Sequence, residues 1–293
     1  MDAFWTILAG SLVAVSCSLL GVFLILRKMA MLGDAISHSI LPGILFAFLL
    51  TGERNAFSML IGAGVLGIFT TFVIEFFHKK GQIQSDAVIG ITFTSLFALG
   101  VILITVFAEQ VDLDQDCVLY GEIAYVPIDL WITENNLNLG PRVVWIMSFV
   151  LLINLLFVVL AYKELKITTF DGAFASAIGM SVSLWHYLLM GAVSLTTVAA
   201  FEAVGAILVV SLLIAPPATA YLLTEDLKKM LFLSVIIGIL TAIGGYYLAL
   251  WLDASIAGSM ATVVGFFFML AVFFSPSSGY FFKQKRRLTS SKK

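Results

Sequence analysis

An acidic and an imidazole side chain, Asp34 and His38, lie four residues apart at the start of an apolar run long enough to span a membrane. A helix places residues i and i+4 on one face, so both side chains can bind the same ligand. Ionisable side chains within a bilayer are costly and usually functional. One oxygen and one nitrogen ligand together suit a borderline divalent cation such as Mn, Fe or Zn. The pair therefore predicts a metal-cation site inside a membrane.

The same two residues also have a structural interpretation. Asp34 would cap the start of its helix, and His38 would be a hydrogen-bonded histidine of the core. Pro42 favours the ion site, because it cannot donate the helical hydrogen bond to the carbonyl of His38. A carbonyl freed within a membrane needs another partner, and a locally opened helix is a common way to build an ion site. Two ligands cannot hold a metal selectively, so a symmetric dimer would supply two more.

The composition indicates an all-α, polytopic membrane protein. The chain has 293 residues, of which 61% are hydrophobic and 12% are charged, whereas a soluble domain has about 25% charged residues. The first apolar run lacks a basic leader and a cleavage site, so we expect a retained span and not a removable signal peptide. We expect a transmembrane domain over residues 1–276 and a basic cytoplasmic tail over residues 277–293.

About nine transmembrane helices are predicted from runs of sufficient length. They lie at residues 4–26, 33–51, 57–77, 86–107, 143–162, 184–201, 203–223, 230–252 and 258–276. The runs 184–201 and 203–223 have no polar loop between them, so eight helices are the alternative. With nine, 14 of the 16 Lys and Arg residues lie on one side, and only Arg54 and Arg142 lie on the other. The positive-inside rule then places the N-terminus outside and the C-terminus in the cytoplasm.

Three further residues and one loop are candidates for a role in transport. Glu202 lies between two apolar runs and is either a turn residue outside the membrane or a buried acid near a pathway. Pro216 and Pro217 are expected to kink the span that contains them, which would provide a hinge, as would Pro42. The acidic loop 108–142 either attracts cations or is only a solvated loop.

The cytoplasmic segment 163–183 is expected to contain a short helix. Asp171 would cap a helix over residues 172–178, and Gly179 would end it. A helix of small residues at this face offers a surface on which a soluble partner docks. The sequence has no Gly-x-x-x-x-Gly-Lys-Ser/Thr motif, so the chain is not expected to hydrolyse ATP or to be an enzyme.

Four segments have distinctive motifs: Leu32-Gly-Asp-Ala-Ile-Ser-His-Ser-Ile-Leu-Pro-Gly43, Ser85-Asp-Ala-Val-Ile-Gly-Ile-Thr-Phe93, Thr169-Phe-Asp-Gly-Ala-Phe-Ala-Ser-Ala-Ile-Gly179 and Val204-Gly-Ala-Ile-Leu-Val-Val-Ser-Leu-Leu-Ile-Ala-Pro-Pro-Ala-Thr-Ala220. They resemble the motifs of the metal-ion ABC permeases, the family of zinc, manganese and iron importers. The resemblance covers essentially the whole chain in order, and the first motif is highly specific. The segments 112–121 and 201–205 look most like those of the manganese and iron transporters.

The resemblance implies a multi-pass subunit of an ATP-binding-cassette importer in a bacterial inner membrane. Two permeases, identical or related, would join two cytoplasmic ATPase subunits, and an external binding protein would deliver the cation. Asp34 and His38 would line the path as metal ligands. The segment 170–179, with Phe170, Asp171, Ala175 and Gly179, would be the coupling helix that docks on the ATPase.

We therefore expect ATP-driven import of a divalent transition metal, with manganese favoured and zinc or iron as alternatives. No cofactor is expected to stay bound, because the metal is the transported substrate, and no nucleic acid is expected as a partner. One rival function is a permease for an iron chelate or cobalamin, whose large substrates need a wide path without ligands. The other rival is a stand-alone, ion-coupled metal carrier, which would need no ATPase.

Overall fold

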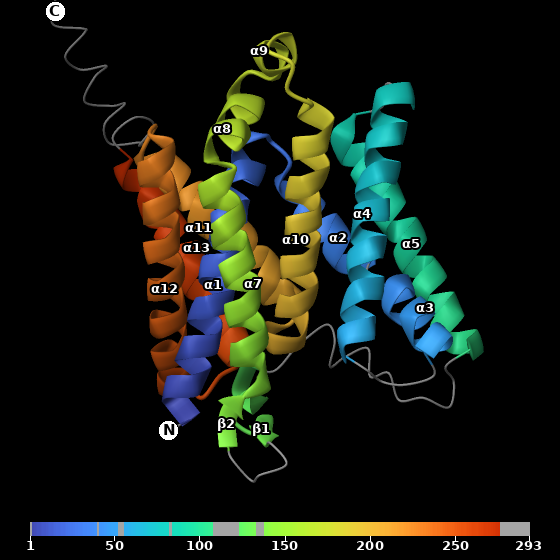
Figure 1. Cartoon of the computed structure of the whole chain (residues 1–293). Coiled ribbons are helices and arrows are strands. Elements are labelled where there is room, and N and C mark those ends of the chain that lie inside the picture. The colour runs from blue at the N-terminus through green and yellow to red at the C-terminus, as the bar shows by residue number, and fades with distance from the viewer. Residues whose placement is uncertain are drawn as a thin grey trace, which may run out of the picture. The chain divides into compact units, whose positions relative to one another are not determined.

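The computed structural model describes residues 2–39, 41–51, 56–81, 84–107, 123–132 and 138–275. Nearly all of these residues are helical (Figure 1). The helices are α1 (Asp2–Leu26), α2 (Ala30–Ser39), α3 (Leu41–Thr51), α4 (Ala56–Gly81), α5 (Ser85–Phe107), α7 (Arg142–Leu160), α8 (Tyr162–Phe170), α9 (Gly172–Ala177), α10 (Val182–Val204), α11 (Ala206–Leu223), α12 (Leu227–Leu252) and α13 (Ile256–Phe274). Within the described residues, seven helices are long and apolar enough to cross a membrane: α1, α5, α7, α10, α11, α12 and α13. The prediction of a multi-pass helical membrane protein is confirmed.

Eight of the predicted spans coincide with one helix each, within a few residues. The exception is the span 33–51, which corresponds to two helices, α2 and α3, on either side of residue 40. Residue 40 and the basic tail 277–293 lie outside the described residues. The two runs without a polar loop form separate helices, because α10 ends at Val204 and the next residue, Gly205, has a φ of +77°, which favours glycine.

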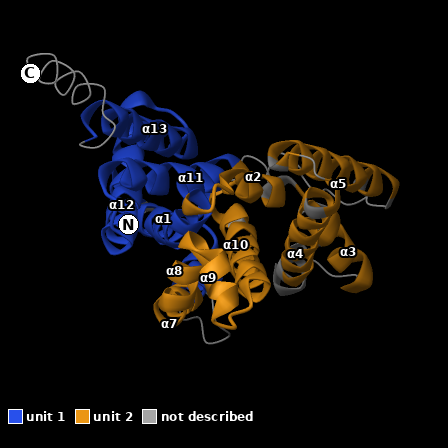
Figure 2. Cartoon of the chain, turned by 90° about the horizontal axis from the view of Figure 1, so that it is seen from above, with its two compact units in different colours: residues 1–25, 122–151, 207–293 blue, residues 26–121, 152–206 orange. Residues whose placement is uncertain are grey.

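The chain forms two compact units, which Figure 2 shows in different colours. Unit 1 comprises residues 1–25, 122–151 and 207–293, and therefore holds α1, α11, α12, α13 and the first half of α7. Unit 2 comprises residues 26–121 and 152–206, and therefore holds α2, α3, α4, α5, α8, α9, α10 and the end of α7. Both candidate ligands on α2 thus belong to unit 2.

In unit 1, helices approach closely where one of them presents a glycine. A Cβ atom on Gly21 of α1 would collide with the carbonyl oxygen of Leu213 on α11 and would come within 2.8 Å of Pro217 Cγ. A Cβ atom on Gly245 of α12 would come within 2.5 Å of the Cα atom of Met260 on α13. Membrane helices are held largely by such close contacts of small residues, because lipid gives no hydrophobic drive for association.

The loop between α5 and α7 contains structure that the sequence did not predict. It holds a short helix, η1 (Ile123–Tyr125), and an antiparallel hairpin of β1 (Leu130–Ile132) and β2 (Asn138–Pro141). Gly140 of the hairpin, with φ of +86°, packs on Trp5, whose ring would lie 2.9 Å from a Cβ atom there. The hairpin therefore covers the start of α1. The other residues of the acidic loop, 108–122 and 133–137, lie outside the described part of the chain.

In unit 2, α10 contacts α2, α4, α8 and α9, and polar side chains join it to its neighbours. The Ser194 hydroxyl donates to the carbonyl of Gly64 on α4 at 3.3 Å. The Asn154 amide on α7 donates to the Thr196 hydroxyl at 2.7 Å. Hydrogen bonds of this kind between membrane helices contribute about 0.6 kcal/mol on average. They fix α10 as the helix around which unit 2 is assembled.

Two of the basic segments predicted to be cytoplasmic meet in unit 2. The Arg27 guanidinium donates to the hydroxyls of Thr168 and Thr169 on α8, each at 3.0 Å. Burial lowers the pKa of Arg27 to about 10, so the side chain still carries its charge near neutral pH. The segments 27–32 and 163–183 therefore lie at the same end of the unit, as the predicted topology requires.

Candidate functional site

Asp34 and His38 both lie on α2, which is continuous over the two residues. Their four-residue spacing therefore places them on one face of a helix, as predicted. The helix begins at Ala30, so Asp34 lies four residues inside it and does not cap it, which removes that structural interpretation. The Asp34 side chain is half-buried, and the side chain of His38 is outside the described ones. Since α2 contacts α4, α5 and α10, an ionisable group is held among the helices of unit 2.

The structure describes two helices, α2 and α3, on either side of residue 40, which lies outside the described residues. α2 ends at Ser39, and α3 begins at Leu41 with Pro42 as its second residue. Proline suits the first turn of a helix, where an N–H group has no helical partner. α3 packs on α4 and α5, whereas α2 also reaches α10. A hinge role for Pro42 remains a prediction.

In the part of the chain that the structure describes, no group of three or more His, Cys, Asp or Glu side chains could hold a metal ion. A metal site with four protein ligands would therefore need ligands in addition to those that the described residues bring together. The expectation that a second chain supplies them stays a prediction.

Glu202 lies in the last turn of α10, next to a tight turn into α11. Its neighbours Phe201, Ala203 and Val204 are buried, as is Gly205. The turn is therefore enclosed by protein and is not an exposed loop. The side chain of Glu202 is outside the described ones, so a place for it along a pathway remains a prediction.

Pro216 and Pro217 lie inside α11, and the helix continues beyond them to Leu223. Pro217 has no N–H group for the carbonyl of Leu213, four residues earlier. This carbonyl is the one against which Gly21 of α1 packs. This contact, in which the proline and the glycine together let two helices meet, was not predicted from the sequence. A hinge role for both prolines stays a prediction.

The predicted short helix of segment 163–183 is present as α9. The Asp171 carboxylate accepts a hydrogen bond from the Phe174 N–H at 2.8 Å, which caps the helix as expected. Gly179 follows the end of the helix with φ of +83°. α8, which precedes α9 and packs against it, was not predicted, because only a loop was expected there.

One side of α9 is buried and the other presents large apolar side chains. Ala175 is fully buried, whereas Phe170, Phe174 and Ile178 are each more than half exposed. Phe174 and Ile178 lie four positions apart on α9 and its C-cap, and Phe170 ends α8 on the other side of Asp171, whose backbone is not helical. We call these three exposed residues the α9 ridge. Exposed apolar patches outside the membrane spans mark contact sites for partners.

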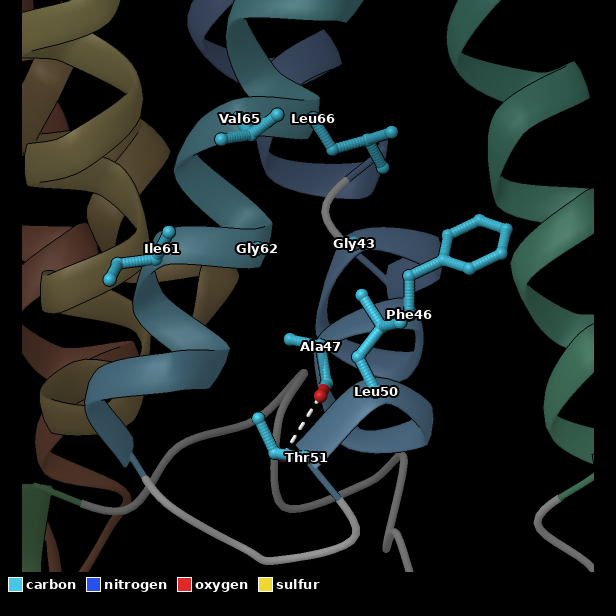
Figure 3. Close-up of a pocket in the computed structure, with 9 residues that line it drawn as sticks. All are labelled: Gly43, Phe46, Ala47, Leu50, Thr51, Ile61, Gly62, Val65 and Leu66. Carbon is cyan, nitrogen blue, oxygen red and sulfur yellow. Dashed lines mark hydrogen bonds between the residues drawn. The ribbon is translucent and has the colours of Figure 1, made fainter.

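A groove of about 440 Å³ lies between α3 and α4 of unit 2 (Figure 3). It is lined by Gly43, Phe46, Ala47, Leu50, Thr51, Ile61, Gly62, Val65 and Leu66. The Thr51 hydroxyl donates to the carbonyl of Ala47 at 2.9 Å, and the other lining side chains are apolar. The groove presents no carboxylate or imidazole, so it offers no ligand set for a metal cation.

Comparisons with known proteins agree with the resemblance found in the sequence. A model of the ABC 3 transport family matches residues 3–275. The manganese transport system membrane protein MntD of Bacillus subtilis is 49% identical over 288 residues, covering 98% of this chain and 97% of that protein. The zinc transport system membrane protein TroD of Treponema pallidum is 44% identical over 273 residues, covering 93% of this chain and 74% of that protein. Among solved structures, PsaBC from Streptococcus pneumoniae in complex with Fab matches with a TM-score of 0.77 and 34% identity, over 94% of this chain and 92% of that chain.

Proposed function

The chain belongs to the ABC 3 transport family, and from this premise we propose that it is the permease subunit of an ATP-driven importer of a divalent transition metal. The observation that carries the proposal is similarity over nearly the whole chain to proteins named for manganese and zinc transport. Manganese is favoured, because the relative that is 49% identical is named for that metal. Zinc and iron are the alternatives.

Asp34 and His38 are the proposed ligands of the cation during its passage. Their support is the continuity of α2 over both residues and the place of Asp34 among helices of unit 2. A nitrogen–oxygen site binds zinc more tightly than manganese, so the selection of manganese must come from geometry and from the protein that delivers the metal. A second permease would supply the remaining ligands.

We further propose nine membrane-spanning segments, with α2 and α3 together forming the second. The N-terminus would lie outside and the C-terminus in the cytoplasm of a bacterial inner membrane. The grouping of Arg27 with α8 supports this topology, since the positive-inside rule places basic segments in the cytoplasm. The α9 ridge would then face the cytoplasm and dock on an ATPase subunit, and an external binding protein would deliver the metal.

The capping of α9 gives a prediction about this coupling. Asp171→Ala should lower the ATPase stimulation by metal-loaded binding protein about fivefold, because loss of an N-cap costs about 1 kcal/mol and α9 has only six residues. Asp171→Asn, which still accepts the Phe174 N–H, should retain most of the stimulation. The measurement is ATP hydrolysis by the assembled complex, and full stimulation of the alanine variant would contradict a coupling role for α9.

The function itself is tested by reconstituting the full chain in vesicles with its ATPase and binding protein. We expect manganese uptake that requires ATP and both partners, and a lower manganese content in cells that lack this chain. Uptake by the chain alone would instead support a stand-alone carrier. A response to binding protein loaded with an iron chelate would support a chelate importer.

A further inference from the structure

Unit 2 holds a second contact between a carboxylate and an imidazole, apart from the pair on α2. Glu75 Oε2 on α4 lies 3.8 Å from His186 Nε2 on α10, and the two side chains are 16% and 12% exposed. The neighbouring Tyr187 hydroxyl hydrogen-bonds to Glu75. We propose that Glu75 and His186 form a second divalent-cation site, which the transported metal occupies after it leaves the Asp34–His38 pair. This inference rests on the proposed function.

The separation of the two ligand atoms suits a shared ion. At 3.8 Å, Glu75 Oε2 and His186 Nε2 are beyond ordinary hydrogen-bond distance. Two ligand atoms at about 2.1 Å from a tetrahedral ion lie roughly 3.4 Å apart. Side-chain movements of a few tenths of an ångström would therefore bring both atoms onto one cation. The ligand types are those of Asp34 and His38, so the same class of cation is selected.

Backbone packing holds Glu75 and His186 opposite each other. A Cβ atom on Gly67 of α4 would collide with the Ser194 side chain of α10, so the two helices are in close contact there, and Figure 1 shows them side by side. Glu75 lies eight residues after Gly67, and His186 lies eight residues before Ser194. Since a helix rises 1.5 Å per residue, both side chains lie about 12 Å from this contact, towards the same end.

The second pair also lies level with Asp34 along unit 2. The hydroxyls of Thr70 on α4 and Ser39 on α2 are hydrogen-bonded at 2.9 Å. Asp34 lies five residues before Ser39, and Glu75 lies five residues after Thr70. On these antiparallel helices, both carboxylates are therefore displaced by about 7.5 Å towards the same end. A cation leaving Asp34 would find the Glu75 carboxylate at the same depth, on a helix that contacts α2.

The two pairs differ in how they respond to helix movement. Asp34 and His38 share one helix, so their spacing is fixed, whereas Glu75 and His186 are on two helices. α10 also contacts α9, so a displacement of α9 would change the separation of Glu75 and His186. Conduction needs sites that bind an ion well enough to receive it and weakly enough to release it. A pair of ligands on two helices can both bind and release the ion, because movement of one helix separates the two ligands.

The test is a Mn²⁺ titration of the full complex carrying Asp34→Asn and His38→Gln, followed by electron paramagnetic resonance. We expect one remaining Mn²⁺ per permease chain, with nitrogen coupling in spin-echo spectra from an imidazole ligand. Adding Glu75→Gln or His186→Gln should weaken this binding by more than about tenfold, and His186→Gln should remove the nitrogen signal. Glu75→Gln keeps an oxygen for the Tyr187 hydroxyl, so the contact between the helices is preserved.

His78→Gln is the matched control, because His78 is an exposed histidine on the same helix as Glu75 and should leave Mn²⁺ binding unchanged. Absence of Mn²⁺ binding in the starting variant would overturn the inference, as would binding that persists in both Glu75→Gln and His186→Gln. The pair would then be an ion pair between helices only. If Glu75→Gln prevents assembly, His186→Gln alone decides the result. Failure of the proposed function is distinguishable, because it would appear as manganese uptake by the unmodified chain that requires neither ATP nor the partner proteins.

Discussion

Replacing both Asp34 and His38 with alanine should abolish ATP-driven metal uptake while leaving the complex assembled. A cation that enters the membrane must exchange its hydration shell for protein ligands, and the double variant removes both ligands that α2 offers. Each single change should already lower uptake by about tenfold to a hundredfold, as is typical when a metal site is impaired. The measurement is uptake of radioactive manganese into vesicles containing the complete importer.

Assembly should survive, because the contacts that hold α2 in unit 2 include the Ser39–Thr70 hydrogen bond and the buried residues Leu32 and Ile36. Matched controls are Asp86→Ala, which removes an exposed acid from the first turn of α5, and His78→Ala on α4. Both should keep uptake near the wild-type rate. Normal uptake by the Asp34 and His38 double variant would refute the proposed site.

The membrane helices could be predicted from sequence because a bilayer imposes a simple requirement. A spanning segment must satisfy its own backbone hydrogen bonds and must be apolar over about 20 residues. The separation of α10 from α11 was expected only as one of two alternatives, and its boundary was placed before residue 203, whereas Gly205 caps α10 in the structure. By contrast, Asp171 and Gly179 could be recognised as the ends of a short helix, because capping depends on residues adjacent in the chain.

Features that depend on tertiary contacts were not predictable in this way. Asp34 precedes an apolar run and so resembles a helix cap, but α2 starts earlier, and the burial of Leu32 supports its first turn. α8 has few apolar residues, and its stability depends on burying Leu165 and on the hydrogen bonds between Arg27 and its threonines.

Contacts between distant residues leave no periodic signal in one sequence. Glu75 and His186 are more than a hundred positions apart, and each taken alone has the features of a residue near the membrane surface. The packing of α4 on α10, which includes the contact of Gly67 with Ser194, brings them together. The sequence therefore predicts the pair on a single helix, whereas the pair on two helices becomes visible only in the structure.

The contact between α1 and α11 predicts the largest effect on stability. Gly21→Ala should destabilise the protein by about 1–3 kcal/mol, the usual cost of overpacking, because the added Cβ atom would collide with the Leu213 carbonyl oxygen. This atom belongs to the backbone and cannot rotate away as a side chain can. A larger residue, as in Gly21→Leu, should prevent accumulation of the folded chain. Thermal unfolding of the purified chain and its yield in the membrane measure the two effects.

Gly265→Ala on α13 is the matched control, because no atom lies within 4 Å of a Cβ built at that position. It should leave stability unchanged or raise it by up to about 1 kcal/mol, since alanine is the better helix former. The two substitutions add the same methyl group to a membrane helix of unit 1. Gly21→Ala should lower the stability of the protein, whereas Gly265→Ala should raise it or leave it unchanged. Equal stability of both variants would show that α1 and α11 are not in contact at Gly21. Pro217 leaves the Leu213 carbonyl without a helical hydrogen-bond donor. If this carbonyl did not face Gly21, the presence of the prolines in α11 would need another explanation.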